Sequence, residues 1–322
     1  MAEALIYQSD DGVLDYTPVV AAVSGEVRQA ANGQAAIIPT DLAASAKGAM
    51  ITEGIALIAK TANIVFLDGG RVYWDYSANA AHFRKVNDQD FYMGRAFGDA
   101  TAASTTMYVL LNEDPPYDID LIRSDPGISV PTGTQVVGVF GYPKRIGGSN
   151  LLELGATSEA QCIDLLSVDR FSKNANAIIE AVIRVPTNGT GAAVDFNIGI
   201  ANGTSTTDAD AITEHVFFHI DGSDTKIYAQ SKDGTTTVTA TDTTKTFTAG
   251  TAVANKVELW IDTRNTANVL LYVEGVAVLT GSTFKIDAAT GPFGLLAHLE
   301  KTTGTTTGQY MIDRLVARLS DQ

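Results

Sequence analysis

Disulfide bonds within this chain are excluded, because it has a single cysteine, Cys162, among 322 residues. Cys162 lies in the apolar run 161–166, which predicts a small buried side chain in a protein that folds in a reducing cytoplasm. No signature of a catalytic cysteine surrounds it. We therefore expect a structural residue and no thiol chemistry.

Basic residues and long apolar runs are also scarce. The chain has 22 Lys and Arg against 37 Asp and Glu, which gives a net charge of −15. Such a surface repels the phosphates of nucleic acids and anionic lipids, so we expect neither nucleic acid nor membrane as a partner. No uncharged apolar stretch approaches the roughly 20 residues that span a bilayer, and the N-terminal residues lack the pattern of a signal peptide.

Short segments that alternate apolar and polar residues make up most of the chain. From residue 151 onward, turns such as Asn-Gly and Asp-Gly separate them, which predicts an antiparallel sandwich of about ten strands. Shorter strands are expected in the first third, centred on residues 70–112, and residues 1–16 are predicted to be a flexible arm or an edge strand. One helical turn is expected at residues 40–48, capped by Thr40 and ended by Gly48.

The length favours two domains, and proline marks the boundary between them. Five of the nine prolines fall between residues 113 and 150. Proline fixes φ and removes a hydrogen-bond donor, so this segment is not expected to supply central strands. We predict a β-rich domain at 1–112, a semi-rigid Pro/Gly-rich connector at 113–150 and a sandwich at 151–322.

A series of short motifs in the first third resembles the capsid decoration proteins of tailed phages, which are β-tulip-like head-stabilising proteins. The motifs occupy residues 24–25, 36–44, 53–60, 71–75, 93–97 and 108–111. The resemblance implies a small β-tulip or barrel-like domain that binds the major capsid protein as a homotrimer on the outer surface of the head. It also implies a virion protein made in the cytoplasm of the bacterial host, without a cofactor.

The C-terminal half, most clearly residues 256–319, resembles a concanavalin-like jelly roll. A likeness of fold implies a sandwich and no particular activity. The predicted fold class is therefore all-β, with a β-tulip-like domain followed by an antiparallel jelly-roll β-sandwich that projects outward from the head.

Two groups of residues in the first domain are candidates for contact with the capsid or within a trimer. Leu5, Ile6 and Tyr7 lie in the N-terminal arm, which we expect to become ordered on the capsid by adding a strand to a sheet. Tyr73 and Trp74 lie in a predicted strand and are expected either in the core or at a trimer contact.

Trp260 and Tyr272 are the candidate glycan contacts of the second domain. Parity places both on the polar faces of paired strands, and in the right register they would form an aromatic platform for a sugar ring. The other interpretation is that a second sheet or a neighbouring subunit covers them. The platform supports an alternative function, a carbohydrate-binding or receptor-binding virion protein.

Two groups of residues are considered as metal ligands, and neither matches the pattern of a metal site. His215 and His219 are four residues apart but lie in a predicted strand, where they share a face with Phe217 and have no third ligand. The acidic segments 208–210 and 221–224 do not match a calcium-binding loop and are typical of turns. We expect no metal.

One pair of carboxylates is considered as catalytic, and its spacing does not suit catalysis. Glu258 and Asp262 share one face of a predicted strand roughly 13 Å apart, farther than the 5–10 Å that glycoside hydrolysis requires. They are expected on a solvated face. With no catalytic residue to name, the sequence predicts a binding protein and no enzyme.

Overall fold

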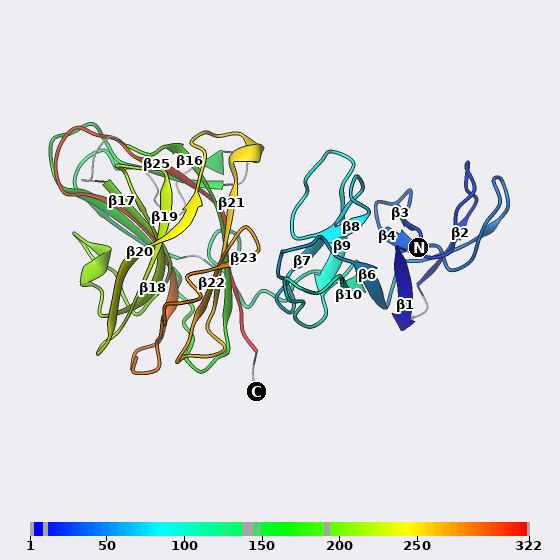
Figure 1. The fold of residues 1–322 in the computed structure, drawn as a ribbon. Coiled ribbons are helices and arrows are strands. Elements are labelled where there is room, and N and C mark those ends of the chain that lie inside the picture. The colour runs from blue at the N-terminus through cyan, green and yellow to red at the C-terminus, as the bar shows by residue number, and fades with distance from the viewer. Residues whose placement is uncertain are drawn as a thin grey trace. The chain divides into compact units, whose positions relative to one another are not determined.

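A computed structural model describes residues 3–8, 12–125, 127–136, 145–146, 149–189 and 194–320 of the chain. The chain divides into two compact units, Met1–Pro116 and Tyr117–Gln322 (Figure 1). The described residues form β-strands joined by turns, with two three-residue 3-10 helices. None of the helices in these ranges has the length and apolar character needed to cross a membrane.

Unit 1 is built from two antiparallel sheets. The larger has six strands in the order β1-β6-β10-β9-β7-β8, and the smaller has four in the order β2-β5-β4-β3. The strands of unit 1 are β1 (Ala4–Gln8), β2 (Val13–Tyr16), β3 (Val27–Gln29), β4 (Ala35–Ile37), β5 (Gly48–Ile51), β6 (Ile55–Ala59), β7 (Arg71–Asp75), β8 (Ala80–His82), β9 (Phe91–Ala96) and β10 (Thr106–Leu111).

Of two local predictions for unit 1, the edge strand at the N-terminus is confirmed and the helical turn at residues 40–48 is not. Residues 4–8 form β1, an edge strand of the six-stranded sheet, so the edge-strand interpretation of the N-terminus is confirmed for the described residues. The helical turn predicted at residues 40–48 is wrong. Leu42 forms a β-bridge with Ala22 instead, and the surrounding residues are turns.

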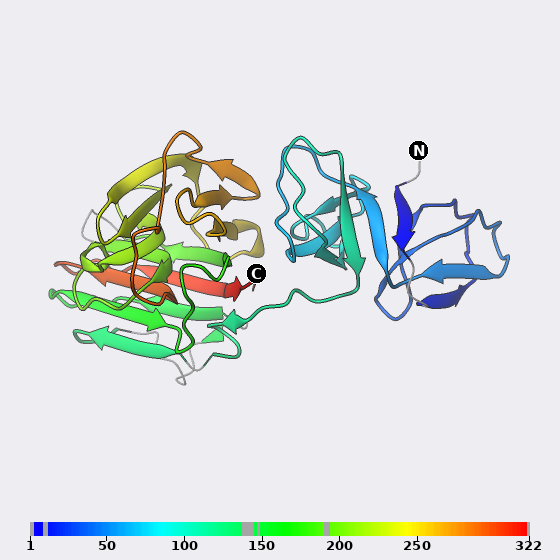
Figure 2. The ribbon, with the colours of Figure 1, turned by 90° about the horizontal axis from the view of Figure 1, so that it is seen from below.

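Unit 2 is an antiparallel β-sandwich, as predicted (Figures 1 and 2). One sheet has the order β13-β14-β25-β16-β21-β22-β23 with β11 also paired to β25, and the other has the order β12-β15-β24-β17-β18-β19-β20. Its elements are β11 (Ile119–Asp120), β12 (Ile128–Thr132), β13 (Arg145–Ile146), β14 (Ser149–Glu153), β15 (Gln161–Leu166), β16 (Ile178–Thr187), β17 (Val194–Ala201), η1 (Ala209–Ala211), β18 (Glu214–Asp221), β19 (Lys226–Asp233), β20 (Thr237–Thr246), η2 (Val253–Asn255), β21 (Val257–Asp262), β22 (Leu270–Val273), β23 (Val276–Val278), β24 (Gly294–Lys301) and β25 (Gln309–Arg318).

Apolar and polar side chains alternate along these strands, and the apolar ones fill the space between the two sheets. On β16, Ile179, Ala181 and Ile183 point into a single large core, while the residues between them face outward. Phe196 of β17 stacks on Tyr310 of β25 with ring centroids 4.3 Å apart, which ties the two sheets together. Each sheet therefore has one face in this core and one outer face available for other contacts.

The predicted connector at 113–150 is not a separate segment of the structure. Unit 2 begins at Tyr117, β11 pairs with β25, and β12 pairs with β15 at the edge of its sheet. Pro131 lies within β12. An edge strand tolerates proline because one side of it needs no ladder hydrogen bond, so proline content did not exclude strands here. Residues 137–144 of the expected connector lie outside the described residues.

Candidate interaction surfaces

The outer face of the six-stranded sheet in unit 1 carries an unusual number of apolar side chains. We call it the open face. Leu5 is 58% exposed, Phe97 48% and Tyr108 38%, and half-buried apolar side chains lie between them. The open face comprises Leu5, Ile55, Leu57, Arg71, Tyr73, Tyr92, Arg95, Phe97, Tyr108 and Leu110. A sheet face that gathers exposed apolar and aromatic side chains in this way is typical of an interaction site.

Strand register explains how these residues come together. Leu5 of β1 lies opposite Leu57 of β6, which lies opposite Tyr108 of β10. The amide of Phe97 donates to the carbonyl of Tyr108, which places the phenyl ring next in the same row. Residues from four segments of the chain thus form one stripe across the sheet.

A glycine bulge on β9 sets the direction of its charged side chain. Gly94 has φ +145°, and a Cβ at this position would lie 1.9 Å from the carbonyl oxygen of Leu110. The register shifts by one residue here, so that Tyr92 and Arg95 both face outward. A bulge re-aims side chains in this way, and only glycine permits it at this position.

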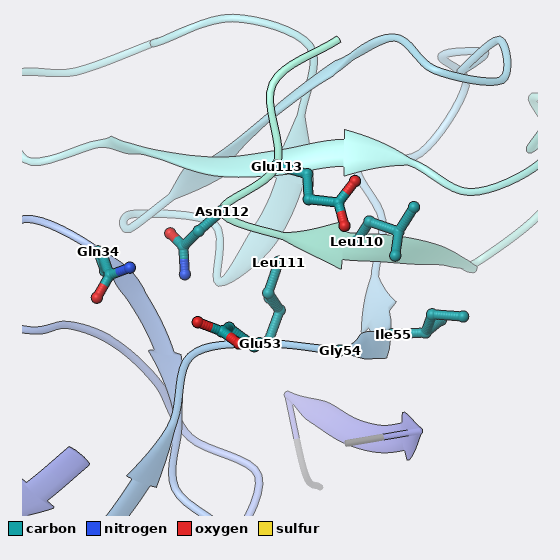
Figure 3. Close-up of a pocket in the computed structure, with 8 residues that line it drawn as sticks. All are labelled: Gln34, Glu53, Gly54, Ile55, Leu110, Leu111, Asn112 and Glu113. Atoms are coloured by element: carbon teal, nitrogen blue, oxygen red, sulfur yellow. The ribbon is translucent and has the colours of Figure 1, made fainter. Parts of the chain in front are cut away.

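A pocket of about 290 Å³ adjoins the open face (Figure 3). Ile55 and Leu110 belong to both, and Glu53, Gln34, Asn112 and Glu113 supply its polar lining. Asn112 holds the two sheets of unit 1 together here, because its side-chain amide donates to the carbonyls of Ala35 and Thr52 and accepts from the amide of Ala35. The carboxylate of Glu113 pairs with Arg95 at 2.9 Å.

The predicted contact residues of unit 1 fall on different faces. Leu5 and Tyr73 lie on the open face, and Tyr73 packs edge-on against Tyr92 with centroids 5.4 Å apart. Ile6 is half-buried opposite Ala56, and the side chain of Tyr7 lies outside the described residues. Trp74 is fully buried, so its prediction as a contact residue is wrong and the core interpretation is confirmed.

In unit 2, a loop covers the outer face of the sheet that contains β24. We call residues 202–213 the capping loop. Its Ala209 and Ile212 form a small apolar cluster with Leu166, Phe217 and Leu296 of the sheet beneath. The side chain of Gln230 also donates to a carboxylate oxygen of Asp210. This face is therefore closed by the chain itself.

Beneath the capping loop lies a buried row of hydrogen-bonded ionisable side chains, which we call the buried chain. His298 bonds to Asp164 through Nδ1 at 2.8 Å and to Glu300 through Nε2 at 2.5 Å, and all three side chains are at most 4% exposed. The other carboxylate oxygen of Asp164 accepts from the amide of Ser205, and Glu300 accepts from the amide of Ala209. The same groups thus hold the sheet together and fasten the loop.

Burial and pairing shift the pKa values of these groups. Burial alone lowers the pKa of His298, but its hydrogen bonds to Asp164 and Glu300 outweigh this and raise that pKa to about 9. Burial also raises the pKa of Glu300. Asp195 lies opposite Glu300 in the sheet, and burial together with the charge of Glu300 raises the pKa of Asp195 to about 7. At neutral pH His298 is therefore a cation between carboxylates.

The predicted aromatic pair of unit 2 exists but is covered. Trp260 and Tyr272 lie opposite one another on β21 and β22 with ring centroids 6.0 Å apart, so the register that the platform requires is present. Their exposed fractions are only 5% and 6%, so they do not form the open platform that a sugar ring requires. Parity showed which residues share a face but not that the face is covered.

Glu258 and Asp262 on the same strand are also buried, so their predicted place on a solvated face is wrong. Glu258 pairs with Arg314 at 2.5 Å and Asp262 with Arg264 at 2.7 Å. A carboxylate tolerates such burial when a guanidinium neutralises it.

The histidines and acidic turns considered as metal ligands have other partners. His215 and His219 lie on a strand, as predicted, where Nδ1 of His215 contacts the carbonyl of Ile212 and Nδ1 of His219 contacts Asn197. Asp208 caps η1, and Asp221 accepts from the amide of Ser223. Among the described residues, no group of three or more His, Cys, Asp or Glu side chains is placed to hold a metal ion.

Two groups of side chains, besides the capping loop, were missed by the reasoning from sequence. The first is the buried chain centred on His298, for which the signal was His298 and Glu300 sharing one face of a strand at alternate positions. The second is the middle of the open face, Leu57, Phe97 and Tyr108, where each residue looked like an ordinary strand residue. Cys162 is buried as predicted.

Two protein families match this chain, one in each unit. The family described as phage cement protein matches residues 7–111, and the family described as SO2946-like, C-terminal domain, matches residues 153–313. No curated protein matches the chain.

Solved structures resemble part of this chain at low sequence identity. The carbohydrate recognition domain of Emp47p is 11% identical with a TM-score of 0.42, over 63% of this chain and 94% of that one. The protein of unknown function SO2946 from Shewanella oneidensis MR-1 is 13% identical with a TM-score of 0.38, over 61% and 80%. The alginate lyase AlgAT5 is 14% identical with a TM-score of 0.38, over 54% and 79%.

The second family match covers half of the 322 residues, and the first covers nearly all of unit 1. The chain belongs to the family with an SO2946-like C-terminal domain, and its residues 7–111 match the model of the phage cement family.

Proposed function

We propose that this protein is a phage cement protein, which binds the outer surface of the head as a homotrimer and stabilises the shell of major capsid protein. The cement-family match over residues 7–111 carries the proposal. The open face supports it, because a surface with Phe97 and Tyr108 exposed is suited to a protein partner. The protein would be made in the host cytoplasm and reside on the virion.

The proposed mechanism is binding without a chemical reaction. A trimer attached to several capsid subunits binds with high avidity, because each further contact forms at a high effective concentration. Ligands that bind only the assembled shell stabilise it by mass action, so cement should raise the temperature at which heads open. The edge strand β1 is the place where a strand of the capsid protein would pair.

The SO2946-like unit is proposed to project outward from the head. Glycan or receptor binding by this unit was the alternative function. The two residues proposed to contact a glycan, Trp260 and Tyr272, are buried, so they do not support that function.

The test is binding of the purified protein to heads stripped of cement, followed by a heat challenge. We expect saturable binding, a higher opening temperature and a trimer by light scattering. Tyr108→Asp should weaken head binding or trimer formation, because it places a charge in the open face. Val168→Asp in unit 2, at a side chain 48% exposed, is the matched control and should leave both unchanged. A monomer that ignores the heads would contradict the proposal.

A further inference from the structure

A second group of exposed apolar side chains lies in unit 1, in the segment that follows β2. We call residues 17–24 the valine loop. Val19 is 90% exposed, Val20 68% and Val23 60%, and the loop contains no charged residue. It follows β2, whose last residue, Tyr16, lies opposite Gly48 of β5. In a chain with a net charge of −15, an uncharged projection is distinctive.

The valine loop is braced and does not owe its exposure to a lack of contacts. Ala22 is buried in the small core of the four-stranded sheet and exchanges two hydrogen bonds with Leu42, of 2.9 and 2.8 Å. The carbonyl of Pro18 accepts from the amide of Ser45 at 2.7 Å, and the amide of Ser24 donates to Asp41 at 2.8 Å. The backbone is thus fixed while the valine side chains point to solvent.

A fixed apolar projection indicates the chemistry of its partner. Because the backbone is already ordered, binding loses little conformational entropy, which favours a loop that inserts into a preformed depression. With no charge and no polar side chain between Val19 and Val23, the loop offers only apolar contact, so the complementary surface must be apolar as well.

The area of the loop distinguishes between two occupants. Each partner of a stable interface buries roughly 800 Å², and a few valine and alanine side chains offer only a fraction of this. The loop alone is therefore too small to hold two copies of this chain together. On a repeating shell, where other contacts already hold the protein in place, a small apolar contact repeated at every copy adds to the total attachment.

We propose that the valine loop inserts into an apolar depression on the outer surface of the major capsid protein. This inference rests on the proposed function and adds to it the element of unit 1 that enters the shell. The open face then serves the broader contacts, and the valine loop serves as a fixed anchor.

The test compares two matched variants in binding to stripped heads. The double variant Val19→Asp/Val20→Asp places charges at the tip of the loop, and Val253→Asp places one at a valine of unit 2 that is 73% exposed. The double variant should bind heads at least about tenfold more weakly, which corresponds to roughly 1.4 kcal/mol. Val253→Asp should bind like the wild type. A second double variant, Val19→Ser/Val20→Ser, removes apolar surface without charge and should also bind more weakly.

Each outcome decides between the proposals. Equal head binding by the wild type and both double variants would overturn the role of the valine loop while leaving the proposed function intact. Loss of the trimer in the double variants, seen by light scattering, would show that the loop contacts another copy and would also overturn it. Failure of the wild type to bind heads would remove the proposed function and this inference together.

Discussion

The open face of unit 1 and the sheet face of unit 2 beneath the capping loop, which we call the capped face, are both outer faces of antiparallel sheets, but only the second is covered by the chain itself. On the open face, Phe97 and Tyr108 are exposed to solvent. On the capped face, the capping loop covers apolar residues and its backbone amides satisfy buried carboxylates. A face that the chain covers itself contributes to the stability of the fold. A face left apolar and exposed contributes little to stability and is available to a partner.

This contrast predicts that substitutions in the capped face change stability, whereas substitutions in the open face change assembly. The largest effect is expected from His298→Ala. Removing the cation leaves Asp164 and Glu300 buried without a neutralising partner, which should lower the free energy of unfolding by about 3–5 kcal/mol, toward the upper end because two carboxylates face the site. Denaturant unfolding measures it.

His219→Ala is the control for this prediction. His219 lies on the same sheet, where its Nδ1 contacts Asn197 at 3.0 Å, its ring lies edge-on to Tyr228 and its Nε2 lies 3.8 Å from Asp195. Its loss should cost about 1 kcal/mol. Equal losses of unfolding free energy in the two variants would show that the buried ionisable groups around His298 do not stabilise the fold more than an ordinary hydrogen bond does.

Adjacent residues of β7 provide the same contrast within unit 1. Trp74 is fully buried and Tyr73 lies on the open face. Trp74→Ala should lower the stability of unit 1 by about 3–4 kcal/mol, because it opens a large cavity. Tyr73→Ala loses mainly its packing on Tyr92, worth about 1 kcal/mol. Calorimetry should show one transition shifted strongly by the first variant and slightly by the second.

Rising pH should weaken the capped face. The pKa of His298 is raised from 6.5 to about 9, so its contribution to stability is complete below about pH 6.5 and is lost as the pH rises through 9. The raised pKa values of Asp195, to about 7, and of Glu300 act in the same direction, since both carboxyls favour folding more when protonated. Ionisable groups near these three include Asp164, Asp208, Asp210, Asp221, Cys162 and His219.

The loss attributable to His298 is about 3 kcal/mol between pH 6 and 10. The protection factors of residues 202–213 in hydrogen exchange, corrected for the intrinsic exchange rate at each pH, should fall over this range, because the amides of Ser205 and Ala209 donate to Asp164 and Glu300. His298→Gln should flatten the pH dependence. An unchanged slope in that variant would assign the pH dependence to other groups.

The structure also shows which features of unit 2 could be predicted from the sequence and which could not. The strands of unit 2 followed from alternation and turn residues, which act locally. Parity also placed Trp260 and Tyr272 on one face, but the register that sets them opposite one another was a condition that only the structure met. The burial of that pair did not follow, because parity says nothing about what covers a face. Pro131 suggested a connector because an edge strand and a connector tolerate proline equally well.

The capping loop escaped prediction for a different reason. Its contacts join backbone amides to carboxylates 41 and 91 residues away in sequence, at Asp164 and Glu300. Such contacts leave no periodic pattern, so no local rule finds them. The open face was partly predicted, through Leu5 and Tyr73, but its middle depends on the register of four strands, which only the three-dimensional pairing gives.

The smallest expected change in stability belongs to Phe97→Ser. Phe97 is 48% exposed, so its ring contributes little to the core, and the free energy of unfolding should change by less than about 1 kcal/mol. Head binding or trimer formation should nevertheless fall markedly, since aromatic side chains carry much of the energy of protein interfaces. Leu270→Ser in unit 2, at a side chain 38% exposed, should leave both properties unchanged. If Phe97→Ser instead lowered stability by several kcal/mol with assembly intact, the open face would be part of the fold and its contrast with the capped face would be lost.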